Sequence, residues 1–243
     1  MAGHSHWANI KHKKKVNDKA KAKVLARMGK LIAIACQMGA PKLDENPRLR
    51  LAVQKARAQN MNNDAIDRAI KKAAGIAAGG KQMVDVTYEG YGPGGAALVI
   101  TAATDNRNRT AAEVKLLLDH GGGSFGSMGC VSWQFTDTAV FLASGTDEDA
   151  VLEALLAGEA DARDISANSD GQVEITAAPN QYDAVLKALA AAGITVEESD
   201  LTKIPENLVS IDDAGTRELL QTLIDDLEDN EDVQDVYHNA VLE

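Results

Sequence analysis

The sequence of 243 residues is poor in cysteine, and it contains no long apolar run. Its two cysteines, Cys36 and Cys130, cannot by themselves form a disulfide framework or a zinc site, so we expect both to be small core residues. No apolar run approaches the roughly 18 residues that a membrane-spanning helix needs. The longest one near the N-terminus, residues 31–36, is too short and begins too late for a secretory signal peptide. We therefore expect a soluble, cytoplasmic protein with no membrane partner.

Positive charge is scarce when the chain is taken as a whole. Its 25 Lys and Arg residues oppose 36 Asp and Glu residues, and this net charge of −11 argues against a polyanionic partner. The charges are segregated, however, because residues 1–81 carry 18 basic and 5 acidic residues, whereas residues 82–243 carry 7 basic and 31 acidic ones. The two parts thus have net charges of +13 and −24. Such asymmetry indicates that the basic part binds nucleic acid.

The basic part has the pattern of three short helices. Apolar positions in residues 24–38 follow the 3.6-residue period of a helix. Asn46 followed by Pro47 is typical of the N-cap and first position of a second helix. A third helical pattern follows the polar break at residues 60–63. We predict a helical nucleic-acid-binding domain over residues 1–81.

The acidic part predicts an α+β fold built from two ferredoxin-like units. Residues 82–136 read as strand, strand, helix and strand, the last strand being expected at residues 131–135. Residues 137–204 have the complete order β-α-β-β-α-β of the split βαβ unit. A last helix and strand lie within residues 205–243, and we infer that they return to complete the first sheet.

The expected fold class is therefore α+β, with an N-terminal three-helix domain followed by two ferredoxin-like α/β domains. One of these is discontinuous, comprising residues 82–136 and 205–243, and the other is inserted into it as residues 137–204.

The first turns of the basic part contain the densest cluster of candidate contacts. Between Lys11 and Lys30 there are nine basic residues and one acid, and lysines spaced by four residues form one ridge of a helix. Such an array is favourable opposite phosphates, which it binds without reading base sequence. The candidate contact residues are His4, His6, Trp7, Lys11, His12, Lys13, Lys14, Lys15, Lys19, Lys23 and Arg27.

Aromatic residues make up 4% of the chain, and none lies between Trp7 and Tyr88. RNA-recognition motifs and OB folds stack bases on several aromatic side chains, so the basic part cannot bind in that way. Trp7 is its one stacking candidate. The expected partner is duplex DNA or structured RNA, bound mainly through phosphates and shape, and the residues do not distinguish between the two.

No catalytic, metal or cofactor site is indicated. His4, His6 and His12 lack a carboxylate or thiol at a ligand spacing, so donation to phosphate explains them better than metal binding. Residues 121–126 match G-x-G-x-x-G, but they follow a helix and precede a strand, the reverse of a dinucleotide site. No Ser or Cys lies in a recognisable nucleophile elbow or at a helix start, and His120 and His238 are isolated. We expect a non-enzymatic protein without a small-molecule substrate.

Two arginines stand out in the acidic part, at the start of the expected helix over residues 107–120. Asp105 or Asn106 can cap this helix, but Arg107 and Arg109 lie in its first turn, where the helix dipole disfavours cations. They either contact an anionic partner or form structural ion pairs, and the sequence leaves both interpretations open.

Five motifs in order along the chain resemble the YebC family, which includes the mitochondrial translational activator of cytochrome c oxidase. They are GHSHWANIKHKK at residues 3–14, NPRLRLAVQKA at 46–56, YEGYGPGG at 88–95, DNRNRT at 105–110 and VQDVYHN at 233–239. The resemblance implies a helical domain and two α/β domains, one inserted into the other. It also implies a probable transcriptional regulator that binds DNA or, alternatively, a ribosome-associated translation factor that relieves stalling, for example at proline runs. The contact residues it implies are His4, Trp7, Lys11, His12, Arg107 and Arg109.

Overall fold

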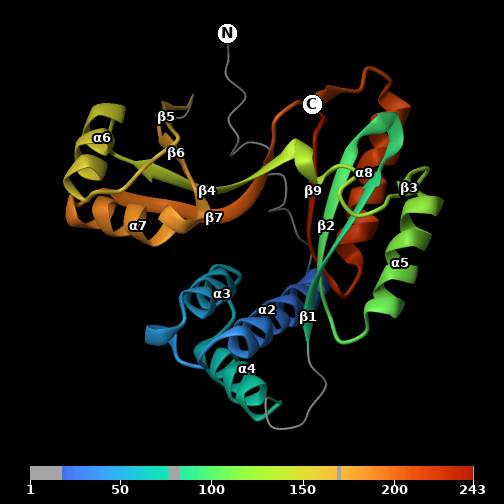
Figure 1. Ribbon diagram of the computed structural model, residues 1–243, viewed down its shortest axis with the longest axis horizontal. Helices are drawn as coiled ribbons and strands as arrows, with labels where there is room; N and C mark the ends of the chain where they lie inside the picture. Colours follow the sequence, from blue (N-terminus) through green and yellow to red (C-terminus); the bar gives the residue numbers. More distant parts are fainter. Residues whose placement is uncertain (1–17, 77–82, 169–170, 243) are drawn as a thin grey trace. The chain divides into compact units, whose positions relative to one another are not determined.

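The computed structural model describes residues 18–76, 83–168 and 171–242, and within these the side chains of residues 18–23, 75 and 76 are left out. Two compact units are formed by the described residues. One consists of residues 134–206, and the other combines the residues up to Trp133 with residues 207–242. Three helices followed by antiparallel α/β sheets confirm the α+β fold class (Figure 1). The division into three domains stays a prediction.

The described residues of the N-terminal part form three helices, α2 (Asp18–Met38), α3 (Pro47–Ala58) and α4 (Asn63–Ile76). A 3-10 turn, η2 (Leu43–Glu45), precedes α3. Each helix has one apolar face, and these faces form a small common core that includes Ile32, Leu49, Val53, Ala56 and Ile66. The three helices expected from the apolar spacing are confirmed.

Asn46 connects the first two helices of this core. Its side-chain oxygen accepts the backbone N–H of Leu49 at 3.0 Å and so caps α3. Its amide nitrogen donates to the carbonyl oxygens of Ala35 and Ala40 at 2.8 and 2.9 Å, near the end of α2. Asn46 is 5% exposed, so these groups would be buried without partners if it were removed.

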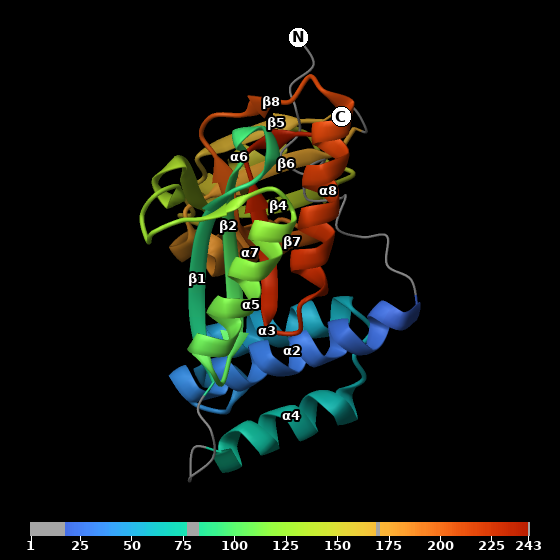
Figure 2. The same ribbon diagram turned by 90° about the vertical axis from the view of Figure 1, so that its right-hand side faces the viewer.

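The first sheet is antiparallel and has the strand order β3-β1-β2-β9. Its strands are β1 (Val84–Tyr91), β2 (Ala97–Thr104), β3 (Ser124–Phe125) and β9 (Val233–His238). Helices α5 (Arg107–His120) and α8 (Ala214–Asp229) lie side by side on one face of it (Figure 2). Pairing of β9 with β2 confirms that the C-terminal helix and strand complete this sheet. The short strands β8 (Val209–Ser210) and β10 (Ala240–Val241) pair in parallel beside it.

The strand expected at residues 131–135 is wrong. Residues Ser132–Gln134 form a 3-10 turn, η4, and the third strand of the sheet is the two-residue β3. The reason is Glu89, whose buried carboxylate accepts the backbone N–H groups of Gly129, Val131 and Ser132 at 2.7–2.8 Å. Amides bound to a carboxylate cannot also pair with a neighbouring strand.

The unit of residues 134–206 has the complete ferredoxin-like order. Its elements are β4 (Phe135–Ser144), α6 (Glu148–Ala157), β5 (Asp164–Ala167), β6 (Val173–Ala177), α7 (Tyr182–Ala191) and β7 (Thr195–Pro205). The sheet is antiparallel in the order β5-β6-β4-β7, and Phe141 packs against Tyr182 of α7 with ring centroids 5.2 Å apart. The β-α-β-β-α-β order expected for this part of the chain is confirmed.

We predict that Asn46→Ala lowers the free energy of unfolding by about 2–3 kcal/mol, because it removes a cap and leaves two carbonyls near the end of α2 without their donor. Asn62→Ala is the matched control, since Asn62 caps α4 through one exposed contact to the Ala65 N–H. It should cost about 1 kcal/mol or less. Urea unfolding of both variants measures the difference. Equal losses would show that the bonds from Asn46 to α2 contribute nothing.

Candidate functional site

The sequence-predicted contact residues fall into three groups in the structure. Those from His4 to Lys15 lie outside the described residues. Lys19 and Lys23 belong to α2, and their side chains are among those left out. Arg27, Arg107 and Arg109 are described in full.

Arg27 lies on α2 and is partly buried. Its Nε atom is buried and has no hydrogen-bond partner among the described residues. The side chain is therefore packed along the helix surface and does not extend freely into solvent.

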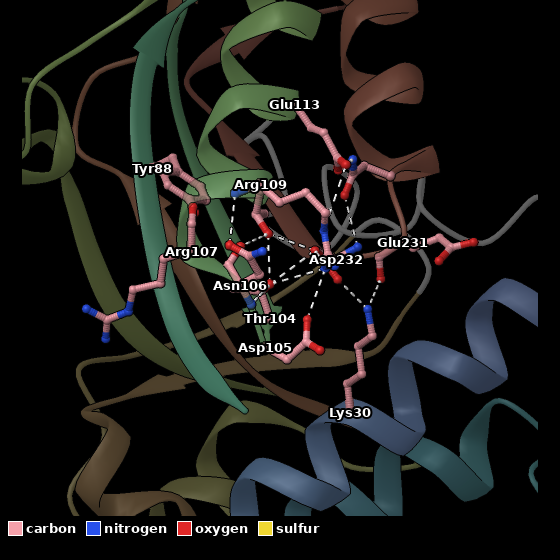
Figure 3. Close-up of polar contacts among 12 residues, drawn as sticks. Lys30, Tyr88, Thr104, Asp105, Asn106, Arg107, Arg109, Glu113, Glu231 and Asp232 are labelled. Carbon is pink, nitrogen blue, oxygen red and sulfur yellow. Dashed lines mark hydrogen bonds and ion pairs between the residues drawn. The ribbon is translucent and has the colours of Figure 1, made fainter. Parts of the chain in front are cut away.

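Arg107 and Arg109 open helix α5 and have different surroundings. Asn106 caps the helix by accepting the Arg109 N–H at 3.2 Å, as its sequence position suggested. Arg107 is exposed and points away from the polar network that surrounds Arg109 (Figure 3). The Arg109 guanidinium lies 2.6 Å from the Asp232 carboxylate and 3.3 Å from that of Asp105. Both side chains are exposed, but the Arg109 charge is paired with carboxylates, whereas Arg107 points away from them.

Asp232 is the centre of this network and comes from the turn that precedes β9 (Figure 3). It is 3% exposed, and both of its oxygens are bonded. Oδ1 accepts from Lys30 Nζ at 2.5 Å, and Oδ2 accepts from Arg109 at 2.6 Å. The hydroxyls of Thr110 and Thr104 also donate to Oδ2, at 2.7 and 3.2 Å. A buried carboxylate is thereby fully neutralised and hydrogen-bonded.

The electrostatics of the site follow from these contacts. Burial raises the pKa of the Asp232 carboxyl, but hydrogen bonds from Lys30, Arg109 and Thr110 outweigh burial and lower the pKa to about 2. The same hydrogen bond and charge raise the pKa of the Arg109 guanidinium. Asp232 is therefore ionised at neutral pH, and it holds both cations.

Lys30 makes the network a connection between the helices and the first sheet. It lies on α2 and donates to the backbone oxygen of Glu231 at 2.8 Å as well as to Asp232. A second ion pair, between Arg48 of α3 and Asp85 of β1, joins the same two parts at a more exposed place. The Lys30 pair is the better protected one, because Asp232 is almost wholly buried.

An open pocket of about 760 Å³ lies beside Asp232. Its lining residues are Lys30, Met83, Asp105, Arg109, Glu113, Asp229, Asn230, Glu231 and Asp232. Five carboxylates against two cations make the pocket unfavourable for phosphate, and both cations are already paired. In the described part of the chain no group of three His, Cys, Asp or Glu residues is arranged to hold a metal ion. The arrangement is suited to holding elements together.

Sequence reasoning missed this network. Asp232 lies within the acidic run of residues 225–235, whose composition is typical of solvated surface, and yet it is buried. Its partner Lys30 is 202 residues away, so no local pattern reveals the pair. The one available signal was position, since Asp232 directly precedes the buried Val233 that begins β9.

Comparison with known proteins places the whole chain in one group. The family model described as the TACO1/YebC protein N-terminal domain matches residues 5–76, and that of the TACO1/YebC second and third domain matches residues 83–240. A protein of Cupriavidus necator named probable transcriptional regulatory protein is 46% identical over all of both chains. One of the same name from Maridesulfovibrio salexigens is 48% identical over 99% of this chain and 95% of its own.

A solved structure resembles the fold over nearly its full length. The crystal structure of a conserved hypothetical protein from Aquifex aeolicus superposes with a TM-score of 0.82 at 36% identity. The match covers 98% of this chain and 97% of that one. Among the described residues, no helix is long and apolar enough to cross a membrane.

We predict that the stability contributed by Asp232 depends on pH. Because its pKa is lowered on folding, the contribution is complete above about pH 5 and is lost as pH falls toward 2. The full contribution is roughly 2 kcal/mol, and about half of it should be gone at pH 3. The stability advantage of wild type over Asp232→Asn should therefore shrink between pH 6 and pH 3 in urea unfolding. A stability advantage that is constant over this range would contradict the prediction. The control is Asp226→Asn on the exposed side of α8, for which no such pH-dependent difference is expected.

Proposed function

Because the chain belongs to the TACO1/YebC family, we propose that it is a non-enzymatic regulator of gene expression that binds nucleic acid, with duplex DNA as its target in transcriptional control. The names of its relatives support regulation of transcription. The DNA contact and its mechanism are our proposal.

The observation that carries this proposal is the segregation of charge. A net charge of +13 in residues 1–81 and of −24 in the remainder makes the two parts of the chain behave oppositely toward phosphate. Neutralising phosphates with Lys and Arg releases condensed counterions, which gives affinity that does not depend on base sequence. The acidic remainder repels the same phosphates, so the protein approaches nucleic acid with its helical part first.

The helices add described cations to those of the N-terminal segment. Arg57, at the end of α3, and Arg68, Lys71 and Lys72 of α4 are all exposed. Together with Arg27 of α2, whose side chain is partly buried, they place basic side chains on all three of the described N-terminal helices. We propose that residues 1–81 act as the binding domain and that residues 137–204 and the discontinuous α/β domain meet protein partners.

In this proposal the ion pairs around Asp232 let the acidic part hold the basic helices in position. Lys30 is a cation of the basic part, and it is used to hold α2 against the start of β9. Arg109 is held by the same carboxylate at the first turn of α5. Of the two first-turn arginines of α5, Arg107 is then the one that is free to reach a phosphate, and Arg109 contributes by fixing the turn from which Arg107 projects.

We predict that replacing Lys11, Lys13, Lys14 and Lys15 by alanine flattens the salt dependence of DNA binding. Each lost phosphate contact should reduce the slope of log affinity against log salt concentration by roughly 0.9 on duplex DNA. The change is measured by fluorescence anisotropy with a labelled duplex at four or five salt concentrations. The control is the double variant Lys115→Ala and Lys187→Ala, which removes exposed lysines of the acidic part. An unchanged slope in the quadruple variant would contradict the phosphate contact.

The same titration with ribosomal RNA fragments, together with co-sedimentation with ribosomes, decides the target. Tight binding to duplex DNA and none to ribosomes supports transcriptional control. Ribosome association that survives near-physiological salt, with weak DNA binding, would replace that proposal with a role in translation.

We predict that alanine at Arg109 affects stability, whereas alanine at Arg107 affects the salt dependence of binding. Arg109→Ala should lower the free energy of unfolding by about 1–2 kcal/mol, since Asp232 loses a charged donor. Arg107→Ala should leave stability within about 0.5 kcal/mol but reduce the salt slope by roughly one contact. Urea unfolding and anisotropy on both variants test this. Loss of stability in Arg107→Ala, or an unchanged slope, would exclude Arg107 as a second phosphate contact.

A further inference from the structure

Three large apolar side chains are exposed together at the end of β1 and in the loop that follows α5. Met128 is 91% exposed, Trp133 68% and Tyr91 38%. Trp133 is one of only two tryptophans in the chain. Large side chains of this kind are ordinarily buried, so their exposure in an aromatic-poor protein indicates a surface that another molecule covers.

The two rings are fixed to the same atom. The Tyr91 hydroxyl and the Trp133 indole N–H both donate to the carbonyl oxygen of Cys130, each at 3.2 Å. Their polar edges are therefore satisfied within the protein, and what remains accessible of each ring is apolar. Rings held in this way lose little conformational freedom when a ligand covers them.

The backbone beneath these rings is anchored as well. Glu89 binds the N–H groups of Gly129, Val131 and Ser132, so the loop is held from one residue after Met128 to one residue before Trp133. The loop also packs too closely for a side chain at two of its glycines. A Cβ on Gly126 would lie 2.3 Å from the Cys130 sulfur, and one on Gly123 would lie 2.5 Å from the Tyr91 carbonyl oxygen.

The two chain segments that carry these rings contain no charged residue that would repel a phosphate. Residues 90–104 and 120–136 contain no Asp, Glu, Lys or Arg, although charged residues make up 25% of the protein. The carboxylate of Glu89, which lies between Tyr88 and Gly90, is buried and bonded inward. They are the longest segments of the acidic part without Asp or Glu, so neither segment itself repels a polyanion.

The exposed area is suited to a base and is too small for a protein. At roughly 200–250 Å² for a whole aromatic side chain, the exposed fractions of Trp133 and Tyr91 correspond to about 250 Å². Even if Met128 is counted as another ring, the sum stays near 450 Å², about half of the roughly 800 Å² per partner in a stable protein interface. One or two bases need no more than this.

We propose that Trp133, with Tyr91 and Met128 beside it, is a stacking platform for an unpaired base of the nucleic acid that the basic part holds by its phosphates. The proposal rests on the proposed function, and it adds a preference for nucleic acid that has a loop, a gap or a single-stranded end. Base stacking on an aromatic side chain tolerates any base, because every base has a π face.

Binding is tested with full-length protein by anisotropy, using a labelled RNA hairpin with an unpaired loop, a gapped DNA and a fully paired duplex. Trp133→Ala should weaken binding of the hairpin or the gapped DNA by roughly 5- to 100-fold and leave the duplex unchanged. Which of the two loses affinity identifies the source of the base. Leu156→Ala is the matched control, since it removes another side chain that is 71% exposed, from α6 in the other unit. It should change none of the three affinities.

Fluorescence gives an independent measurement. In a Trp7→Phe background Trp133 is the remaining tryptophan, and stacking should quench its emission with the looped or gapped ligand but not with the duplex. Equal affinities for all ligands and no effect of Trp133→Ala would overturn the platform while leaving phosphate binding by the basic part intact. Absence of any nucleic-acid binding would overturn both the stacking platform and the proposed function. A change in Trp133 emission that depends on protein concentration alone would overturn it in favour of a second copy of the chain.

Discussion

The buried carboxylate of Asp232 is the constraint around which the larger unit is organised. A carboxylate that is 3% exposed must be neutralised, and this one receives a lysine from α2, an arginine from α5 and two threonine hydroxyls. These donors lie up to 202 residues away in sequence. The carboxylate therefore connects three elements that have no local reason to meet, namely the first helix, the helix after β2, and the strand that closes the sheet.

Much of the fold was predictable because its signals are local. Helical spacing, the Asn46 cap and the β-α-β-β-α-β order all depend on neighbours within a few residues, and they are confirmed. The strand expected at residues 131–135 failed because Glu89, some 40 residues earlier, takes the amides that the strand would have needed. The burial of Asp232 likewise depends on Lys30, which lies 202 residues away in sequence. Local pattern cannot show a partner that only the fold brings near.

The candidate site shows the same limit. The two arginines of the DNRNRT motif look alike in sequence, and because both lie in the first turn of a helix, either could contact an anionic partner. The structure separates them, because Arg109 faces three carboxylates whereas Arg107 points away from that network. The contact residues from His4 to Lys15 lie outside the described residues, so their role rests on charge. In our account the acidic α/β part positions the basic helices and restricts the directions from which a phosphate can approach.

The central claim is that the phosphates of nucleic acid are bound by the basic helical part, with Arg107 as the phosphate contact proposed in the acidic part. Hydrogen-exchange mass spectrometry of the full-length protein, with and without saturating duplex DNA at low salt, tests it most directly. The account predicts slower exchange in residues 1–76 and around Arg107, and unchanged exchange across α6, α7 and the exposed face of α8. Protection confined to residues 137–204, with none in the helices, would contradict it.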